Sequence, residues 1–307
     1  MKTNQQKPLR PNTFVRVRPF QEIISSLDQE GKLDGLPFMP EMAKYCGKRF
    51  MISKRIERTC EETEGSMRYI RDVVFLEDLR CDGLAHGGCQ KDCMIFWKEA
   101  WLQPEEQASE FDNEQILEDQ AAAQLPSRTP DGLFICQSTE LIKATTPVSF
   151  SYFLSYINDI QSKTYSILQV IRILIYAFLI RVRYRLKGTE YRYLRGQQEI
   201  TPVESLNLQP GEWVQVKTKE EIEETLDLQG RNRGLQFNKD MIEYCGEIYR
   251  VLKRLEMMVH EPSQKLIRMK DTVILENIIC EGCRRGMCPR ESYFFWREIW
   301  LKRVDPS

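Results

Sequence analysis

The sequence predicts an α+β protein with an internal duplication, in which two small β-barrel units with short helices are joined by a helical middle segment. Three observations lead to this prediction. The two ends of the chain repeat each other, each repeat alternates short apolar runs with turn residues, and the segment between them carries a long apolar stretch of helical character. We place the units at residues 11–103 and 210–304, and the middle segment at 104–209.

The duplication is visible when the sequence is shifted against itself by a constant 199 positions, as from Tyr45 to Tyr244. No gap is needed over the whole repeat. The superposed residues include rare types: Cys46 and Cys245, Cys81 and Cys280, Cys89 and Cys288, Trp97 and Trp296, and Trp101 and Trp300. So many matches of rare residues indicate two copies of one fold.

Each repeat contains short apolar runs separated by glycine or charged turns, a pattern typical of antiparallel strands. These runs are 14–17, 50–56, 73–79, 213–216, 249–255 and 272–279. Short helices are predicted at 21–27, 219–226, 93–102 and 292–301. In the last two, the tryptophans are spaced i, i+4 and would share one helix face. The run Pro210–Val216 resembles the first strand of SH3-like barrels, so each unit is expected to be a partly open barrel of that kind.

The middle segment differs in composition from the repeats. Residues 104–120 carry acidic but no basic side chains, which indicates a solvated linker. Residues 164–186 are apolar and helical in character, but the uninterrupted apolar run is only 173–180. About twenty apolar residues are needed to cross a bilayer. A buried or interdomain helix is therefore expected, with an interfacial membrane helix and a true span as alternatives.

Composition limits the class of protein. A chain of 307 residues with 42% hydrophobic and 29% charged residues is typical of a globular protein, and its net charge of -1 gives no general signature for nucleic acid. The first ten residues are polar and lack the apolar core of a secretory signal. We therefore expect a cytoplasmic protein. In a reducing compartment its ten cysteines serve as metal ligands, buried thiols or a reactive thiol.

Four cysteines of the first repeat form the first predicted metal site. Cys81, Cys89 and Cys93 occupy a glycine-rich loop, and Cys60 ends a predicted strand. Four thiolates are the number that a tetrahedral zinc or a cubane iron–sulfur cluster requires. Cys93 is also expected to open a helix, whose positive end stabilises a thiolate.

The second repeat keeps part of this pattern, with Val259 and Ser292 in place of two of the cysteines. The candidate ligands of the second metal site are His260, Cys280, Cys283 and Cys288. A degenerate copy with merely buried cysteines is the alternative. A mixed cysteine–histidine site favours zinc, because thiolates alone usually hold clusters. Zinc is therefore the expected cofactor and an iron–sulfur cluster the alternative.

Two residues are candidates for catalysis. His86 lies between the glycines of the first loop, as an exchangeable metal ligand or proton donor, or as a solvated loop histidine. Cys136 lies outside the repeats, as a nucleophile or a buried thiol; the chain has only two histidines to serve as its base, and both are in ligand loops. For Cys46 and Cys245 we expect core packing.

Residues 181–195 form a basic arm in which arginines and a lysine interleave with tyrosines. Basic side chains neutralise phosphates and aromatic rings stack on bases, so RNA, single-stranded DNA or an anionic membrane surface could bind there. A helix end followed by a solvated segment is the alternative.

The motifs Cys81–Gln90 and Trp296–Leu301 carry one further likeness. They resemble those of an uncharacterised bacterial family whose members carry a Cys-Asp-Gly-x-Ala-His-Gly-Gly-Cys-Gln loop and a closing Trp-Arg-Glu-Ile-Trp-Leu helix. The resemblance covers most of the chain except the acidic linker. It implies a grouping and no activity.

Together these features predict a zinc-binding accessory or binding protein in bacterial cytoplasmic biosynthesis, with a protein or a carrier-linked small molecule as its partner. One alternative is an enzyme that depends on a metal or an iron–sulfur cluster, with its site between the two units near Cys81–Cys93. Another is a nucleic-acid-binding protein that uses the basic arm. The first repeat, which keeps four cysteines and His86, is expected to carry the function.

Overall fold

The computed structural model describes residues 8–61, 66–105, 123–148, 194–280, 282 and 288–305, with scattered positions between 160 and 182. The chain forms two compact units. Unit 1 comprises Met1–Leu174, Val259–Leu266 and Glu281–Arg290; unit 2 comprises Ile175–Met258, Ile267–Cys280 and Glu291–Ser307. Unit 1 therefore contains two segments that belong to the second repeat by sequence.

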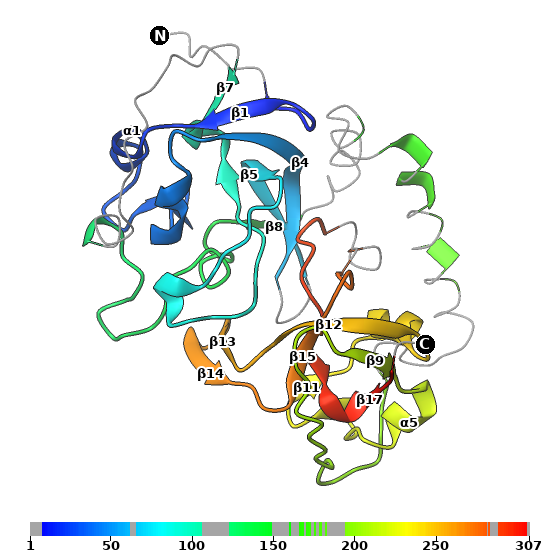
Figure 1. Ribbon diagram of the computed structural model, residues 1–307. Helices are drawn as coiled ribbons and strands as arrows, with labels where there is room; N and C mark the ends of the chain where they lie inside the picture. Colours follow the sequence, from blue (N-terminus) through cyan, green and yellow to red (C-terminus); the bar gives the residue numbers. More distant parts are fainter. Residues whose placement is uncertain are drawn as a thin grey trace. The chain divides into compact units, whose positions relative to one another are not determined.

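The main sheet of unit 1 is antiparallel and has the strand order β6-β5-β4-β1-β7, with β8 paired to β5 off that path. Its strands are β1 (Phe14–Val17), β4 (Arg49–Cys60), β5 (Met67–Leu76), β6 (Trp97–Lys98), β7 (Leu102–Pro104) and β8 (Thr146–Pro147). Figure 1 shows β4 and β5 as the two long strands of this sheet. Strand β4 ends at Cys60, which places that thiol at the edge of the paired region.

The main sheet of unit 2 repeats the same order, β16-β15-β12-β9-β17. Its strands are β9 (Trp213–Val216), β12 (Ile248–Arg254), β15 (Thr272–Leu275), β16 (Trp296–Arg297) and β17 (Leu301–Arg303). The register repeats as well. Val15 pairs with Phe50 in unit 1 and Val214 pairs with Tyr249 in unit 2, both at the sequence offset of 199. The duplicated sequence thus forms duplicated sheets.

Short elements complete both units. The small hairpins are β2 (Lys32–Leu33) with β3 (Leu36–Pro37), β10 (Arg231–Asn232) with β11 (Leu235–Gln236), and β13 (Met257–His260) with β14 (Lys265–Arg268). Two short α-helices within the described repeats are α1 (Phe20–Ser25) and α5 (Lys219–Glu223), which confirm the short helices predicted near 21–27 and 219–226. The 3-10 turns are η1 (Pro40–Tyr45), η2 (Leu84–His86), η3 (Glu99–Trp101), η5 (Lys239–Tyr244) and η7 (Glu298–Trp300).

Each unit is built around a phenylalanine held by two tryptophans. In unit 1 the ring of Phe38 meets Trp97 and Trp101 edge-on, with centroids 6.2 and 5.2 Å away. In unit 2 Phe237 meets Trp296 and Trp300 at 6.1 and 5.1 Å. All six side chains are buried. Edge-to-face contacts at these distances are favourable because the positive edge of one ring meets the negative face of the other.

The predicted fold class is wrong. The described residues are mostly β, in several antiparallel sheets that do not close into barrels, and their helices are few and short. Within the middle segment, the described residues 125–145 form turns and a short bridge between Arg128 and Phe134. Most of 106–122 and 164–186 lies outside the described residues. None of the described helices has the length and apolar character needed to cross a membrane.

The closing helices predicted at 93–102 and 292–301 are also wrong. Trp97 lies in β6, where it pairs with Val74, and Trp101 ends the 3-10 turn η3. A two-residue strand followed by a 3-10 turn brings both tryptophans into the core, because each side chain packs on Phe38. The spacing that looked helical therefore comes from a strand and a turn in succession. Cys93 does not open a helix.

Candidate functional site

The candidate site lies in unit 1, in the loop between β5 and β6. The loop is closed at its base, where the N–H of Cys81 donates to the carbonyl oxygen of Cys93 at 2.8 Å. Gly83 has a φ of +71°, and a Cβ at this position would lie 1.9 Å from the carbonyl oxygen of Cys89. Only glycine fits that approach. The glycine thus lets the chain turn tightly between Cys81 and Cys89.

The loop borders a cavity of about 30 Å³. Its lining includes four cysteines and a histidine: Cys81, His86, Cys89, Cys93 and Cys136. A single water needs roughly 10–15 Å³ of such volume. The cavity therefore has room for an ion or a water or two, and not for an organic substrate of ordinary size.

Three potential ligands, two of them from the cavity lining, meet at one place. One ligand atom from each of Glu41, Cys81 and His86 lies within 4.8 Å of the other two. Among the described residues, no other three histidine, cysteine or carboxylate side chains come together in this way. Glu41 comes from η1, Cys81 begins the loop, and His86 ends η2. The carboxylate Oε1 of Glu41 lies 3.0 Å from the Sγ of Cys81 and 3.0 Å from the Nδ1 of His86.

Both ionisable partners are deeply buried: Glu41 is 2% exposed and His86 is 1% exposed. The second carboxylate oxygen of Glu41, Oε2, is buried without a hydrogen-bond partner among the described residues. His86 Nδ1 likewise has no aligned hydrogen bond there, although it lies at ion-pair distance from Oε1. Buried polar atoms without partners cost stability unless something satisfies them. The solvated alternative for His86 is therefore wrong.

The second ring nitrogen of His86, Nε2, shows which nitrogen of the imidazole carries a hydrogen. Nε2 lies 2.9 Å from the carbonyl oxygen of Ile135. A carbonyl oxygen only accepts, so Nε2 must carry a hydrogen. Nδ1 then faces the carboxylate either as a bare lone pair or as the second N–H of an imidazolium. A histidine that binds a metal through one nitrogen commonly donates the other N–H to a backbone carbonyl in this way.

The surroundings shift the ionisation of these groups in opposite directions. Burial pushes the pKa of Glu41 up, but the close contact with His86 and its charge, together with the hydrogen bond from Cys81, leave that pKa below its usual value. Burial, with the nearby Glu41 carboxylate, raises the pKa of Cys81 well above that of a free thiol. Burial also raises the pKa of Cys136 to about 12, so this thiol is protonated at neutral pH. Cys136 is thus poorly suited to act as a nucleophile.

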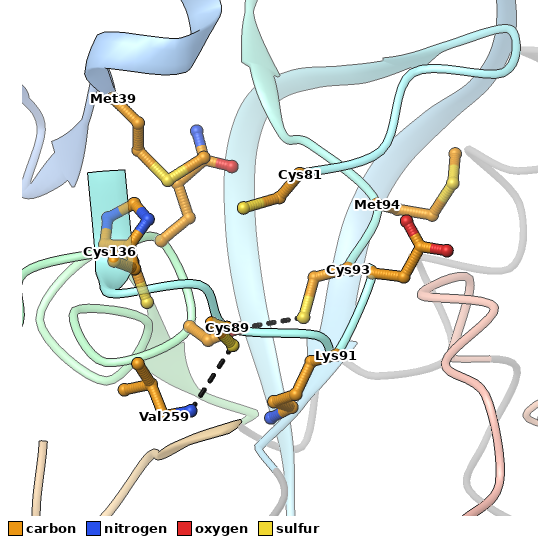
Figure 2. A pocket seen from close by; sticks show the side chains of 12 residues that line it. Met39, Cys81, Cys89, Lys91, Cys93, Met94, Cys136 and Val259 are labelled. Atoms are coloured by element: carbon orange, nitrogen blue, oxygen red, sulfur yellow. Dashed lines mark hydrogen bonds between the residues drawn. The ribbon is translucent and has the colours of Figure 1, made fainter. Parts of the chain in front are cut away.

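Cys89 and Cys93 line the same cavity. Figure 2 shows their side chains turned toward one another, with the Val259 N–H directed at Cys89. That N–H donates to the Cys89 Sγ at 3.3 Å, and the Ser138 hydroxyl lies 3.7 Å from the Cys93 Sγ. Each of these two sulfur atoms therefore has a hydrogen-bond donor nearby.

A second thiol pair lies within unit 1. The Sγ atoms of Cys60 and Cys288 are 2.9 Å apart, and the N–H of Cys60 donates to the Sγ of Cys288 at 3.2 Å. Both residues are buried. Burial alone would raise the pKa of Cys288, but the hydrogen bond with Cys60 and the nearby Arg290 lower it to about 7.

A buried acidic residue neutralises two cations next to these thiols. Oε1 of Glu261 lies 3.0 Å from the Lys91 ammonium and 3.1 Å from the Arg290 guanidinium. The charges of Lys91 and Arg290 hold the pKa of Glu261 at about 2 despite its burial. Lys91 and Arg290 are equivalent residues of the two repeats, again at the offset of 199. Glu261 therefore bridges the two repeats within unit 1.

The structure divides the first predicted ligand set. Cys81, Cys89 and Cys93 line one cavity, whereas Cys60 contacts Cys288, a member of the second set. Of the second set, His260 and Cys288 belong to unit 1 and Cys280 belongs to unit 2. His260 Nδ1 lies 2.9 Å from the Ser263 hydroxyl. Cys283 and most of the basic arm 181–195 lie outside the described residues.

The sequence did not single out Glu41 or Glu261. Glu41 is the only charged residue in the apolar run Leu36–Ala43, and a lone charge in such a run is a signal of a buried, partnered group. For Glu261 the sequence offers no comparable signal, because its partners Lys91 and Arg290 are distant in the chain. The site also depends on the Ile135 backbone, which carries no side-chain signature.

Comparison with known proteins gives no match to any protein family, curated protein or solved structure.

Proposed function

We propose that unit 1 binds a zinc ion through Glu41, Cys81 and His86, and that the ion fixes the cysteine loop to the rest of the unit. The observation that carries the proposal is the orientation of His86. With Nε2–H held by the Ile135 carbonyl at 2.9 Å, Nδ1 points at the Glu41 carboxylate and is the atom left to bind a metal.

The donor set suits zinc. Zinc accepts thiolate, imidazole and carboxylate ligands, and does so in tetrahedral sites. Glu41, Cys81 and His86 supply one of each, and Cys89 or Cys93, which line the same cavity as Cys81 and His86, would be the fourth ligand. The buried Oε2 of Glu41 and Nδ1 of His86 gain a partner when the ion binds. An iron–sulfur cluster is supported less well, because thiolates alone usually hold it.

In this proposal the ion has a structural role, and the protein is an accessory or binding protein of a compartment that keeps thiols reduced. The ligands come from η1 and from the loop, which are about forty residues apart in the chain, so the ion would cross-link two segments. The small cavity supports this role over that of a substrate pocket. The partner that we propose is a protein or a carrier-linked small molecule.

Zinc titration of the full chain tests the proposal. Protein purified without air and stripped with a chelator is titrated with zinc, and bound metal is measured by elemental analysis. We expect the stripped protein to melt at a lower temperature. We expect Cys81→Ser and His86→Ala to lose more affinity than the roughly 10–100-fold that loss of an outer partner costs.

Cys46→Ser is the matched control, because Cys46 is a half-buried thiol that packs on the unit 1 core away from the cavity lining. It should retain wild-type zinc binding. Wild-type affinity in both Cys81→Ser and His86→Ala would exclude the proposed ligand set. Iron in place of zinc in the air-free protein would overturn the choice of metal.

A second function is favoured by one observation. Glu41, Cys81 and His86 are three ligands. Catalytic zinc sites also use three protein ligands and leave the fourth position to water or substrate. If neither Cys89 nor Cys93 binds the ion, the site is open and a metal-dependent enzyme follows. Cobalt-substituted protein separates the two cases. Added imidazole or azide shifts the visible spectrum of an open site and leaves that of a closed site unchanged.

A further inference from the structure

The pair formed by Cys60 and Cys288 stands apart from the proposed zinc ligands. Cys60 ends β4, and Cys288 lies in the segment 281–290 that the second repeat contributes to unit 1. Neither cysteine lines the cavity. Their sulfur atoms are 2.9 Å apart, although the residues are separated by 228 positions in the chain.

We propose that Cys60 and Cys288 are an oxidation site, at which hydrogen peroxide converts the two thiols into a reversible disulfide. The geometry carries this inference. A disulfide bond is about 2.04 Å long, so the sulfurs need to approach by roughly 0.9 Å. Cys60 and Cys288 are already in contact, so the backbone has little distance to move.

The chemistry has a defined direction. We assign Cys288 as the attacking thiol. Its sulfur accepts a hydrogen bond from the N–H of Cys60 at 3.2 Å. The Arg290 guanidinium lies close by, because its Nη1 donates to the Cys60 carbonyl oxygen at 3.1 Å. Hydrogen bonds and a nearby cation favour the thiolate, which is the nucleophile. Cys60 is then the resolving thiol, at the distance that this step requires.

The steps balance as follows. The Cys288 thiolate attacks one oxygen of hydrogen peroxide, the O–O bond breaks, and the hydroxide that leaves takes up a proton to give water. The Cys288 sulfur is now a sulfenic acid. The Cys60 sulfur attacks it, the S–O bond breaks, and the departing hydroxide takes the Cys60 proton as a second water. Two thiols lose two electrons, and one peroxide is reduced to two waters.

The contact between Cys60 and Cys288 has a counterpart between the equivalent residues of the two repeats. The equivalent contact joins Cys89 to Val259, and the Val259 N–H donates to the Cys89 sulfur at 3.3 Å, much as the Cys60 N–H donates to Cys288. Valine stands where Cys60 stands in the first repeat. The backbone arrangement is thus present twice and the second thiol only once, which restricts the cross-link to one of the two contacts.

Peroxide treatment of the full chain tests the inference. Reduced protein is exposed to dilute hydrogen peroxide, free thiols are blocked, and the protein is digested without reduction. We expect one peptide pair, joining the peptide of Cys60 to that of Cys288, an intact mass lower by two hydrogens, and full reversal by a thiol reductant. Cys60→Val, which installs the residue of the second repeat, and Cys288→Ser should both abolish it.

Cys46→Ser and Cys245→Ser serve as controls and should form the cross-link normally. A different cysteine pair, or sulfinic acid at Cys288 without a cross-link, would overturn the proposal. So would a lower zinc stoichiometry in Cys60→Val together with no cross-link in the metal-free wild type, because the pair would then be metal ligands. If Cys60→Val does not fold, the peptide map of the wild-type protein still decides.

Discussion

His86 donates its Nε2–H to the carbonyl oxygen of Ile135 across 2.9 Å, and this bond fixes the orientation of the whole imidazole ring. Ile135 lies outside both repeats, whereas Glu41 and Cys81, which approach the opposite nitrogen, belong to the first. The segment after the acidic linker therefore completes a site that the repeat alone does not contain. The equivalent of His86 in the second repeat is Arg285, so the second copy lacks the ring.

Zinc affinity is expected to rise with pH. Burial and the Glu41 carboxylate raise the pKa of Cys81, so this thiol is protonated at neutral pH and zinc must displace its proton. Competition titrations from about pH 6 to pH 8, with proton release measured by calorimetry in two buffers, check this expectation. Cys81→Ser should show a shallower pH dependence. An affinity independent of pH in the wild type would show that Cys81 is not a ligand.

Gly83→Ala should destabilise the cysteine loop far more than the same substitution at a left-handed glycine with open space around its Cβ. A Cβ there meets the Cys89 carbonyl oxygen at 1.9 Å. Gly132 is the matched control, because it has a similar φ of +80° but nothing within 4 Å of its Cβ. By thermal unfolding we expect about 1 kcal/mol for Gly132→Ala, and at least about 3 kcal/mol for Gly83→Ala. Equal losses would mean that the loop relaxes freely.

Glu261→Gln should remove part of the acid sensitivity of the protein. The folded pKa of about 2 lies below the unfolded value, so Glu261 stabilises the fold fully above about pH 4.5, and this stabilisation is lost as the pH falls toward 2. The contribution is on the order of 3 kcal/mol. Denaturant unfolding at several pH values should give lower stability at pH 7 and a flatter acid limb than wild type.

The control for that measurement is Glu22→Gln, an exposed member of an i, i+4 ion pair with Arg18. Surface pairs contribute little, so its acid limb should match that of the wild type. An unchanged acid limb in Glu261→Gln would show that Lys91 and Arg290 do not depend on this carboxylate.

Trp101→Ala and Trp300→Ala should be equally damaging, because each tryptophan is fully buried against the phenylalanine of its own unit. Large-to-small substitutions of this kind cost about 3–5 kcal/mol. Trp213→Ala, at a residue 37% exposed, should cost much less. Denaturant midpoints for the three variants check the order. A mild effect of Trp300→Ala alone would indicate that the two cores are not equivalent in stability.

The sequence predicted local features better than their arrangement. The strand at 50–56 and the helix near Lys219 are present because alternation and a Thr218 capping box act over a few residues. The helix predicted around Trp97 and Trp101 failed because a short strand followed by a 3-10 turn can mimic helical spacing. The barrel prediction failed because strand count and apolar runs do not determine whether a sheet closes.

The candidate site was predictable only in part. Cysteine spacing in the glycine loop identified Cys81, Cys89 and Cys93, and the structure places all three around one cavity. The pairing of Cys60 with Cys288 required knowledge that residues 281–290 fold into unit 1, and no local pattern contains that information. Glu41 was missed because a single acidic residue has no periodicity.

Residues 259–266 and 281–290 of the second repeat belong to unit 1, so the gene cannot be divided between the repeats without removing part of that unit. A fragment cut between the repeats would carry the first sheet but would lose Glu261, Cys288 and Arg290. Lys91 would then keep its charge without the buried carboxylate opposite it, and Cys60 would face no second thiol. The two copies have thus become interdependent, so that neither half-gene encodes a complete unit 1.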